Sequence, residues 1–194
     1  MNVYDFDQTI LWKDSTFLFV RYCLTRYPAT WKTIPGIIRA SVQYLAGKIN
    51  LEQFKEKVFV FLAYIPATDK VVEQFWETHS KGIKRWYLAQ KRPDDVVVSA
   101  SPEFLLKPIC KKLGVEVIGT IMDPVTGKIT GLNCKGEEKV PRFRALHPDA
   151  KVENFYSDSL SDTPLARLAE HSYIIKGEKL SPWPQKALQA KSIK

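Results

Sequence analysis

The sequence has few of the features that would place a protein outside the cell or across a membrane. Its three cysteines lie far apart and form neither a metal-binding pair nor an even set for disulfides. No stretch of 18 or more residues is free of charge, which argues against a membrane-spanning helix. The first residues enter an expected strand directly, without the basic and then apolar pattern of a signal peptide. We therefore expect a cytoplasmic protein with reduced thiols at Cys23, Cys110 and Cys134.

The sequence also lacks internal repeats, low-complexity tracts and a recognisable nucleic-acid-binding module. Its 194 residues suffice for one large domain, or for a domain with an inserted subdomain. An apolar fraction of 45% is that of an ordinary globular protein. The net charge of +8 favours an anionic partner, either a small phosphate ester or an acidic membrane surface, over nucleic acid. A solvated basic surface explains this charge equally well, and nothing in the sequence sets the oligomeric state.

Two aspartates near the amino terminus carry the strongest functional signal. Asp5 and Asp7 follow a short apolar run, and Thr9 comes two residues later. Side chains of an extended segment alternate between faces, so the two carboxylates are expected to point the same way. Such groups repel each other unless a cation lies between them or one carries a proton. A second pair, Asp158 and Asp162, strengthens the indication, with turn or helix-start residues as the alternative.

Hydrophobic periodicity predicts about 80 residues of helix directly after this motif. Asp14-Ser15-Thr16 supplies capping residues for the first helix, and Gly47-Lys48-Ile49-Asn50 marks a turn between two later ones. This helical stretch is expected to be inserted between two strands. Apolar residues recur three or four apart over 14–27, 30–47, 51–64 and 68–91.

The rest of the sequence alternates between strands and helices. The β-branched run over 95–99 is typical of a strand buried on both faces. The alternation predicts an α/β fold with a mostly parallel sheet and helices on both faces. Ligands of such sheets bind at the carboxyl ends of the strands, which would bring Asp5, Ser99 and Asp158 to one crevice. Further strands are expected over 115–122, 152–156 and 172–175, helices over 102–113, 137–146 and 160–170, and a hairpin turn over 123–127 before residues 128–130.

Read together, four segments resemble the haloacid dehalogenase (HAD) superfamily of phosphohydrolases, in particular its phosphoserine-phosphatase-like branch. They are Tyr4-Asp5-Phe6-Asp7-Gln8-Thr9, the strand end at Ser99, Lys139 near a helix start, and Tyr156-Ser157-Asp158-Ser159-Leu160-Ser161-Asp162. The resemblance covers the chain outside the helical stretch. It implies a Rossmann-like core made of residues 1–11 and 81–194, with a small helical cap inserted as residues 12–80.

The resemblance also implies a mechanism. Asp5 would be the nucleophile, giving an aspartyl-phosphate that water then cleaves. Asp7 would protonate the leaving oxygen and later deprotonate the water. Mg²⁺ would be held by Asp5, by the backbone carbonyl of Asp7 and by Asp158. The implied activity is Mg²⁺-dependent hydrolysis of a small phosphorylated metabolite, and transfer to an acceptor other than water would use the same intermediate.

Four further residues receive roles in the same way. Thr9 and Ser99 would contact the phosphate, although turn hydrogen bonding explains Thr9 equally well. Lys139 would stabilise the negative transition state, and Asp162 would orient Lys139 or the waters of the metal. Lys135 is the alternative to Lys139, but its position relative to the helix disfavours it.

Ser101 is the alternative to Ser99 as the phosphate contact. It precedes Pro102, which is expected to take the first position of a helix. Helix capping therefore explains Ser101 without assigning it a chemical role.

Residues 12–80 would select the substrate, because caps of this kind close over the phosphate site. Asp14, Arg21 and Arg39 are candidates for polar substrate contacts, although capping or solvation explains each more simply. The many aromatic residues of this stretch form either a packed core or an apolar surface that touches lipid. The alternatives to a metabolite phosphatase are therefore a membrane-surface lipid-headgroup phosphatase and a catalytically idle binding or regulatory module.

Overall fold

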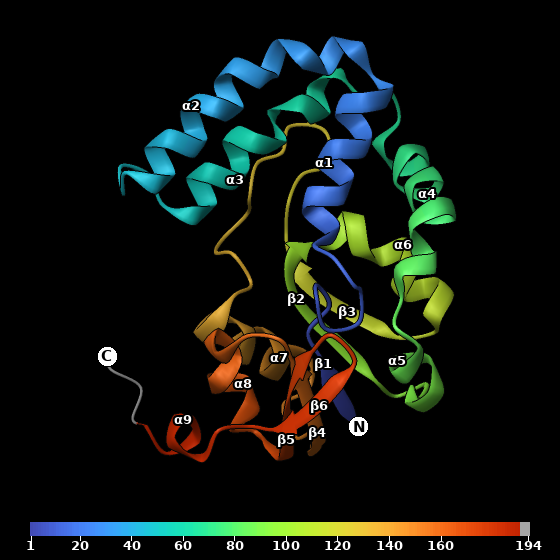
Figure 1. The fold of residues 1–194 in the computed structure, drawn as a ribbon, viewed down its shortest axis with the longest axis vertical. Helices are drawn as coiled ribbons and strands as arrows, with labels where there is room; N and C mark the ends of the chain where they lie inside the picture. Colours follow the sequence, from blue (N-terminus) through green and yellow to red (C-terminus); the bar gives the residue numbers. More distant parts are fainter. Residues whose placement is uncertain (191–194) are drawn as a thin grey trace.

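A computed structural model describes residues 1–190 and contains a six-stranded sheet (Figure 1). The strand order is β3-β2-β1-β4-β5-β6, and every neighbouring pair is parallel except β5 with β6. The predicted α/β fold with a mostly parallel sheet is therefore confirmed. The strands are β1 (Asn2–Tyr4), β2 (Val96–Pro102), β3 (Glu116–Thr120), β4 (Val152–Ser157), β5 (Ala169–Lys176) and β6 (Lys179–Pro182).

The central strand β1 is short, but its pairing on both sides fixes the position of its carboxyl end. Val3 pairs with Val96 of β2 on one side and with Phe155 of β4 on the other. Successive strand residues point to opposite faces, so Val3 and Tyr4 belong to two different hydrophobic clusters. Each face of the sheet therefore has its own buried core, which holds the end of β1 rigidly between β2 and β4.

Helices cover both faces of the sheet. On the Tyr4 face the cluster includes residues of α4, α5 and α6, and on the Val3 face it includes residues of α7 and α8. In Figure 1, α1, α2 and α3 extend beyond one end of the sheet. The helices are α1 (Ser15–Arg26), α2 (Ile34–Leu45), α3 (Leu51–Phe59), α4 (Thr68–His79), α5 (Arg85–Gln90), α6 (Glu103–Leu113), α7 (Lys139–Leu146), α8 (Thr163–Ala166) and α9 (Gln185–Gln189).

Helix α3 is tied to the core by two adjacent polar side chains. The Glu56 carboxylate accepts a hydrogen bond from the backbone N–H of Ile129 at 2.9 Å. The Lys55 ammonium donates to the backbone carbonyl of Ala100 at 2.8 Å and to the side-chain oxygen of Asn133 at 2.6 Å. These bonds hold α3 in place over the ends of β2 and β3. We refer to α1, α2 and α3 together as the helical cover. The proposed division into a core of 1–11 and 81–194 and a cap of 12–80 stays a prediction.

Several predicted elements differ from the observed ones. The helix expected over 68–91 is wrong as a single element, because Ile83 forms a β-bridge with Leu11 between α4 and α5. The helix expected over 160–170 is short, since β5 already begins at Ala169. The hairpin after 123–127 is reduced to one bridge, between Met122 and Ile129. Strand β6 and helix α9 have no counterpart in the sequence prediction.

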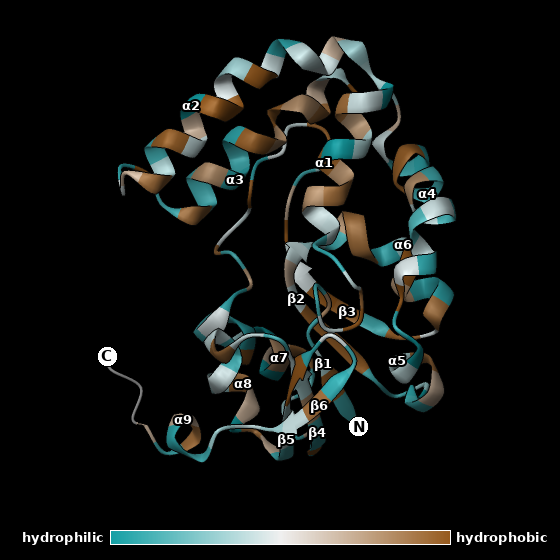
Figure 2. Ribbon diagram, viewed as in Figure 1, coloured by the Kyte–Doolittle hydropathy of each residue, from teal (hydrophilic) through white to brown (hydrophobic). Residues whose placement is uncertain are grey.

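Hydrophobic residues also occur along α2, at the outer edge of the molecule (Figure 2). Only Ala40 of this helix is buried. Within residues 1–190, no helix has both the length and the apolar character needed to span a bilayer.

Candidate active site at the ends of the central strands

Asp5 lies directly after β1, and the neighbouring strand holds its backbone. Its N–H donates to the carbonyl of Tyr156 in β4 at 2.8 Å, which extends the sheet ladder past the end of β1. The residue is only 7% exposed. Asp5 is therefore a buried carboxylate at the carboxyl end of a central strand, the position at which α/β sheets bind ligands.

Lys139 pairs with Asp5 across a separation of 134 residues. Its Nζ atom lies 2.6 Å from Oδ1 of Asp5 and 2.7 Å from Oδ2 of Asp162. The ammonium group is buried between these two carboxylates, and Lys139 is the first residue of α7. The structure thus brings together Asp5, Lys139 and Asp162, three residues that the sequence analysis assigned to one site.

Ser157 completes this arrangement. Its hydroxyl donates to the same Oδ2 atom of Asp162 at 2.7 Å. Asp162 therefore receives two hydrogen bonds at one oxygen and is held in a single orientation toward Lys139. We refer to Asp5, Thr9, Lys139, Ser157 and Asp162 as the Asp5 network.

The charges of the Asp5 network are strongly coupled. Burial alone would lower the pKa of Lys139, but the carboxylates of Asp5 and Asp162 outweigh it and raise that pKa above its usual value. Burial raises the pKa of Asp5, and the charges of Asp162 and Asp7 add to this shift, against the lowering effect of Lys139. Lys139 is therefore a fixed positive charge beside a carboxylate that water hardly reaches.

Thr9 connects Asp5 to Asp158. The Thr9 hydroxyl accepts a hydrogen bond from the N–H of Asp158 at 2.9 Å and lies 3.4 Å from Oδ2 of Asp5. Thr9 is completely buried, so it orders the loops that follow β1 and β4. Burial also raises the pKa of Asp158. One hydroxyl group thus links the carboxylate of Asp5 to the backbone of Asp158.

Asp7 has partners of its own. Oδ1 of Asp7 accepts a hydrogen bond from the N–H of Ser15 at 2.7 Å, and Oδ2 accepts one from the hydroxyl of Ser101. The sheet ladder reaches Asp5 but a turn begins at Asp7, so strand alternation does not extend to Asp7 and does not fix the relative direction of the two side chains. Burial, opposed by these hydrogen bonds, raises the pKa of Asp7 to about 6.

Ser101 is a contact of Asp7 and not a helix cap, so the expectation of capping is wrong. Helix α6 begins at Glu103, with Pro102 before it and no capping side chain. The Ser101 hydroxyl also lies 3.1 Å from that of Ser15. Ser99 is buried within β2, and its hydroxyl accepts a hydrogen bond from the N–H of Ser101 at 3.1 Å. Ser101 therefore contacts Asp7. Ser99 lies inside β2, which continues to Pro102, so its expected position at the strand end is wrong.

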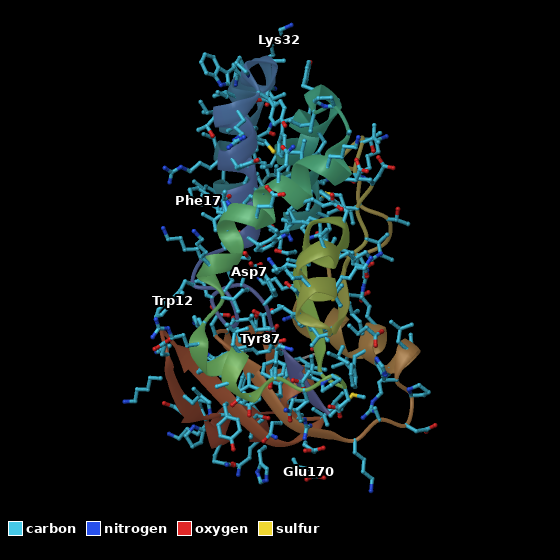
Figure 3. The ribbon with its side chains drawn as sticks, turned by 90° about the vertical axis from the view of Figure 1, so that its right-hand side faces the viewer. Asp7, Trp12, Phe17, Lys32, Tyr87 and Glu170 are labelled. Carbon is cyan, nitrogen blue, oxygen red and sulfur yellow. The ribbon has the colours of Figure 1, made fainter. Side chains whose placement is uncertain are left out.

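A cavity of about 560 Å³ lies beside Asp7, between the helical cover and the end of β2. Figure 3 shows Asp7 below Phe17 of α1, at the level between the sheet and the cover. Lys55 of α3 also lines the cavity, and burial lowers its pKa to about 8. Of the substrate-contact candidates in the cover, Asp14 lines this cavity, whereas Arg21 and Arg39 are exposed and are not among its lining residues.

Ser157 and Lys55 were not predicted as site residues, and Ser101 was considered but set aside in favour of Ser99. Ser101 follows Ser99 by two positions in a strand, which is the one available signal for a shared location. Nothing in the local sequence separates Lys55 from the other lysines of its helix.

The oxygen-rich group at Asp5 and Asp158 fits Mg²⁺. Within residues 1–190 no three His, Cys, Asp or Glu side chains gather closely enough to hold a metal ion by themselves. Mg²⁺ does not need such a cage, since it commonly binds through one or two carboxylates and keeps several waters. The carboxylates of Asp5 and Asp158 and the backbone carbonyl of Asp7 are the groups that would hold it, and Thr9 links the Asp5 side chain to the backbone N–H of Asp158.

Two curated proteins are similar to this chain. Protein CicA of Caulobacter vibrioides is 26% identical over 188 residues, which cover 86% of this chain and 82% of that protein. A probable phosphatase of Mycobacterium tuberculosis is 34% identical over 97 residues, 44% of this chain and 33% of that protein.

Solved structures share the fold. A protein of unknown function from Bordetella pertussis Tohama I aligns with a TM-score of 0.70 at 23% identity, over 89% of this chain and 87% of that one. A probable phosphoserine phosphatase from Vibrio cholerae aligns with a TM-score of 0.61 at 12% identity, over 88% of this chain and 55% of that one.

The family comparison confirms the predicted resemblance and the predicted enzyme class. Residues 3–167 match the family described as haloacid dehalogenase-like hydrolase. This span includes every residue of the Asp5 network, together with Asp7 and Asp158. The chain belongs to the haloacid dehalogenase-like hydrolases.

Proposed function

We propose that the protein is a Mg²⁺-dependent phosphatase that hydrolyses phosphomonoesters through an aspartyl-phosphate on Asp5. The observation that supports this most is the contact of Asp5 with Lys139 at 2.6 Å, beside a second carboxylate, Asp7, that has separate partners. One buried aspartate is thus placed next to a fixed positive charge, and the other is poised to exchange a proton. This division of roles is what transfer of a phosphoryl group to a carboxylate requires.

In the first step an Asp5 oxygen attacks phosphorus. The new bond joins that oxygen to phosphorus, the bond from phosphorus to the leaving oxygen breaks, and Asp7 supplies the proton that the leaving oxygen takes up. A pKa of about 6 leaves a fraction of Asp7 protonated near neutral pH, as an acid catalyst needs. Lys139 offsets negative charge that develops on the phosphoryl group.

In the second step water attacks the same phosphorus and Asp7 takes its proton. The bond from phosphorus to Asp5 breaks, and both carboxylates return to their starting states. Mg²⁺, when bound at Asp5, the Asp7 carbonyl and Asp158, would screen the repulsion between the phosphate dianion and the carboxylates. The hydroxyl groups of Ser99 and Thr9 would orient the phosphate. Thr9 also orders the loops that follow β1 and β4.

Hydrolysis of an aryl phosphate, with and without Mg²⁺, tests this function. We expect Asp5→Asn to lower the rate by about 10³-fold or more, because the nucleophile is lost. The exposed Asp149→Asn is the matched control and should keep the wild-type rate. Mass spectrometry after rapid quenching should find a phosphoryl group on the peptide that contains Asp5. An Asp5→Asn variant with unchanged activity would overturn the assignment, and a wild-type protein that turns over no phosphate ester would indicate an idle module.

A further inference from the structure

The cavity beside Asp7 has mainly apolar walls. Phe17, Val20, Ile37, Phe54 and Val58 line it from α1, α2 and α3. A phosphorylated sugar or amino acid would leave those of its polar groups that face this apolar part of the wall without partners, at a cost in binding free energy. An apolar leaving group would bury its surface there instead. The cavity therefore favours a phosphomonoester whose alcohol carries a long apolar part.

Helix α2 presents a second apolar face on its outer side. Ile34, Ile38, Val42 and Leu45 are spaced four, four and three apart, so they form one stripe along the helix. Their exposed fractions are 36%, 60%, 62% and 85%. A surface helix normally turns polar residues outward, and a continuous exposed apolar stripe marks an interaction surface.

The charge around this stripe identifies its partner. Residues 15–51 contain no aspartate or glutamate. The exposed Trp31 lies in the same part of the chain, and Figure 3 places Lys32 at the end of the cover farthest from the sheet. Apolar, aromatic and basic side chains together are the composition of a surface that lies on anionic lipid. The basic residues of this stretch are Arg21, Arg26, Lys32, Arg39 and Lys48, and all are exposed.

A second copy of this chain fits the stripe less well. A symmetric contact through α2 would place the same surface patch of both copies face to face. Because the charged residues of the stretch 15–51, which contains α2, are all basic, the two copies would repel each other there. An anionic bilayer has the opposite charge and also offers an apolar interior.

We propose that α2 lies on an anionic lipid bilayer through Ile34, Ile38, Val42 and Leu45, and that the substrate is the phosphomonoester headgroup of a membrane lipid. Ile37 and Ser41 on the inner side of the same helix line the cavity, so α2 separates the bilayer from the site. The apolar part of the lipid occupies the cavity, and its phosphate reaches Asp5. The substrate assignment rests on the function proposed above.

Vesicle co-sedimentation tests the docking surface. The full chain should bind vesicles that mix phosphatidylcholine with phosphatidylglycerol, and bind pure phosphatidylcholine vesicles much less. The double variant Ile38→Asp/Val42→Asp should lower binding to the mixed vesicles by about tenfold or more, because two charges enter the apolar face. Leu146→Asp, at a residue of α7 that is 60% exposed, is the control and should bind as the wild type does.

Absence of wild-type binding to the mixed vesicles would overturn the proposal. So would equal binding by the double variant, or light scattering that shows a wild-type dimer which the variant disrupts. In the last case α2 would be a contact between copies of this chain.

Hydrolysis rates on three phosphate esters distinguish a wrong lipid assignment from a wrong proposed function. The wild type should hydrolyse phosphatidate in mixed vesicles faster than glycerol 3-phosphate, and the double variant should lose the first activity while it retains aryl phosphate hydrolysis. A wild type that cleaves the aryl phosphate with Mg²⁺ but shows no preference for phosphatidate would overturn the lipid substrate alone. A wild type that cleaves none of these esters would overturn the proposed function.

Discussion

Asp5 and Asp7 are two residues apart, yet their surroundings differ in kind. Asp5 contacts the buried ammonium group of Lys139. That group and the Ser157 hydroxyl both donate hydrogen bonds to Asp162. Asp7 is held by a backbone N–H and a serine hydroxyl, and it faces a cavity with mainly apolar walls. The residues of the Asp5 network lie at the ends of sheet strands and at the starts of the helices beside them. Most of the cavity wall comes from the helical cover.

This difference separates the reaction from the choice of substrate. A network of charges around Asp5 suits one chemical step and tolerates little change, because each buried group depends on its partner. An apolar wall near Asp7 can change shape without disturbing that network. Substitutions in the Asp5 network and substitutions beside Asp7 should therefore have different effects.

Lys139→Met should have the largest effect. It leaves Asp5 and Asp162 without their shared cation, and the loss of one partner of a buried ion pair costs about 3–5 kcal/mol of unfolding free energy. Activity should fall below detection. Urea denaturation measures the first effect and phosphate release the second. Lys135→Met, at an exposed lysine, should change neither.

The instability of Lys139→Met should also depend on pH. Burial raises the pKa of Asp5 in the folded protein, so the folded state binds the proton more strongly than the unfolded state. The free energy of unfolding then falls as pH rises from the ordinary pKa of an aspartate to the raised pKa of Asp5. The loss of unfolding free energy in the variant should therefore be smaller at pH 5 than at pH 8. A deficit independent of pH would show that the lost charge pair is not its cause.

Asp7→Asn should lower the rate by about 10²- to 10⁴-fold without loss of stability, because proton transfer is lost while the surrounding packing remains. The reduction should be smaller for an aryl phosphate whose phenol is acidic, since that leaving group needs no proton. Asp14→Asn changes a carboxylate that lines the same cavity and keeps a side chain that caps α1. It should retain most of the activity. Equal losses in both variants would contradict a special role for Asp7.

The sequence predicted the Asp5 side of this comparison well. The resemblance to the haloacid dehalogenase superfamily placed Lys139 and Asp162 beside Asp5, and the structure brings the three within hydrogen-bond distance. Their catalytic roles stay predictions. The core also follows from local pattern, since the β-branched run at 96–98 lies in a buried central strand.

The Asp7 side was predicted less well, because it depends on contacts between distant segments. The break between α4 and α5 arises where Ile83 pairs with Leu11, and Gly82 directly before it is the one local breaker, which the periodicity argument did not use. Ser101 was explained as a cap because only its neighbours in sequence were considered. The reach of Lys55 to Ala100 follows from the packing of α3 over β2, which periodicity does not specify.

Ser99→Ala and Ser101→Ala should separate phosphate binding from proton transfer. If Ser99 contacts the phosphate, its substitution should raise KM about tenfold, the cost of one hydrogen bond to a charged group. Ser101→Ala removes a donor to Asp7, so it should lower kcat several-fold and change KM little. Steady-state kinetics on an aryl phosphate distinguish the two. The reverse pattern would make Ser101 the phosphate contact.

Lys55 should give the smallest effect, and it tests whether the helical cover contributes charge to the site. Burial lowers its pKa to about 8, so the ammonium loses its proton as pH rises through that value. If the charge attracts the phosphate, KM should rise by up to about fivefold above pH 8, since a partly exposed charge pair contributes about 1 kcal/mol or less. Lys55→Arg keeps its charge and should remove this rise, whereas Lys55→Met should show the higher KM throughout. Lys57→Met, at an exposed lysine of the same helix, should behave as the wild type. If KM in Lys55→Met matches the wild type below pH 8, then Lys55 only ties α3 to the core, and the cover shapes the site through its apolar walls alone.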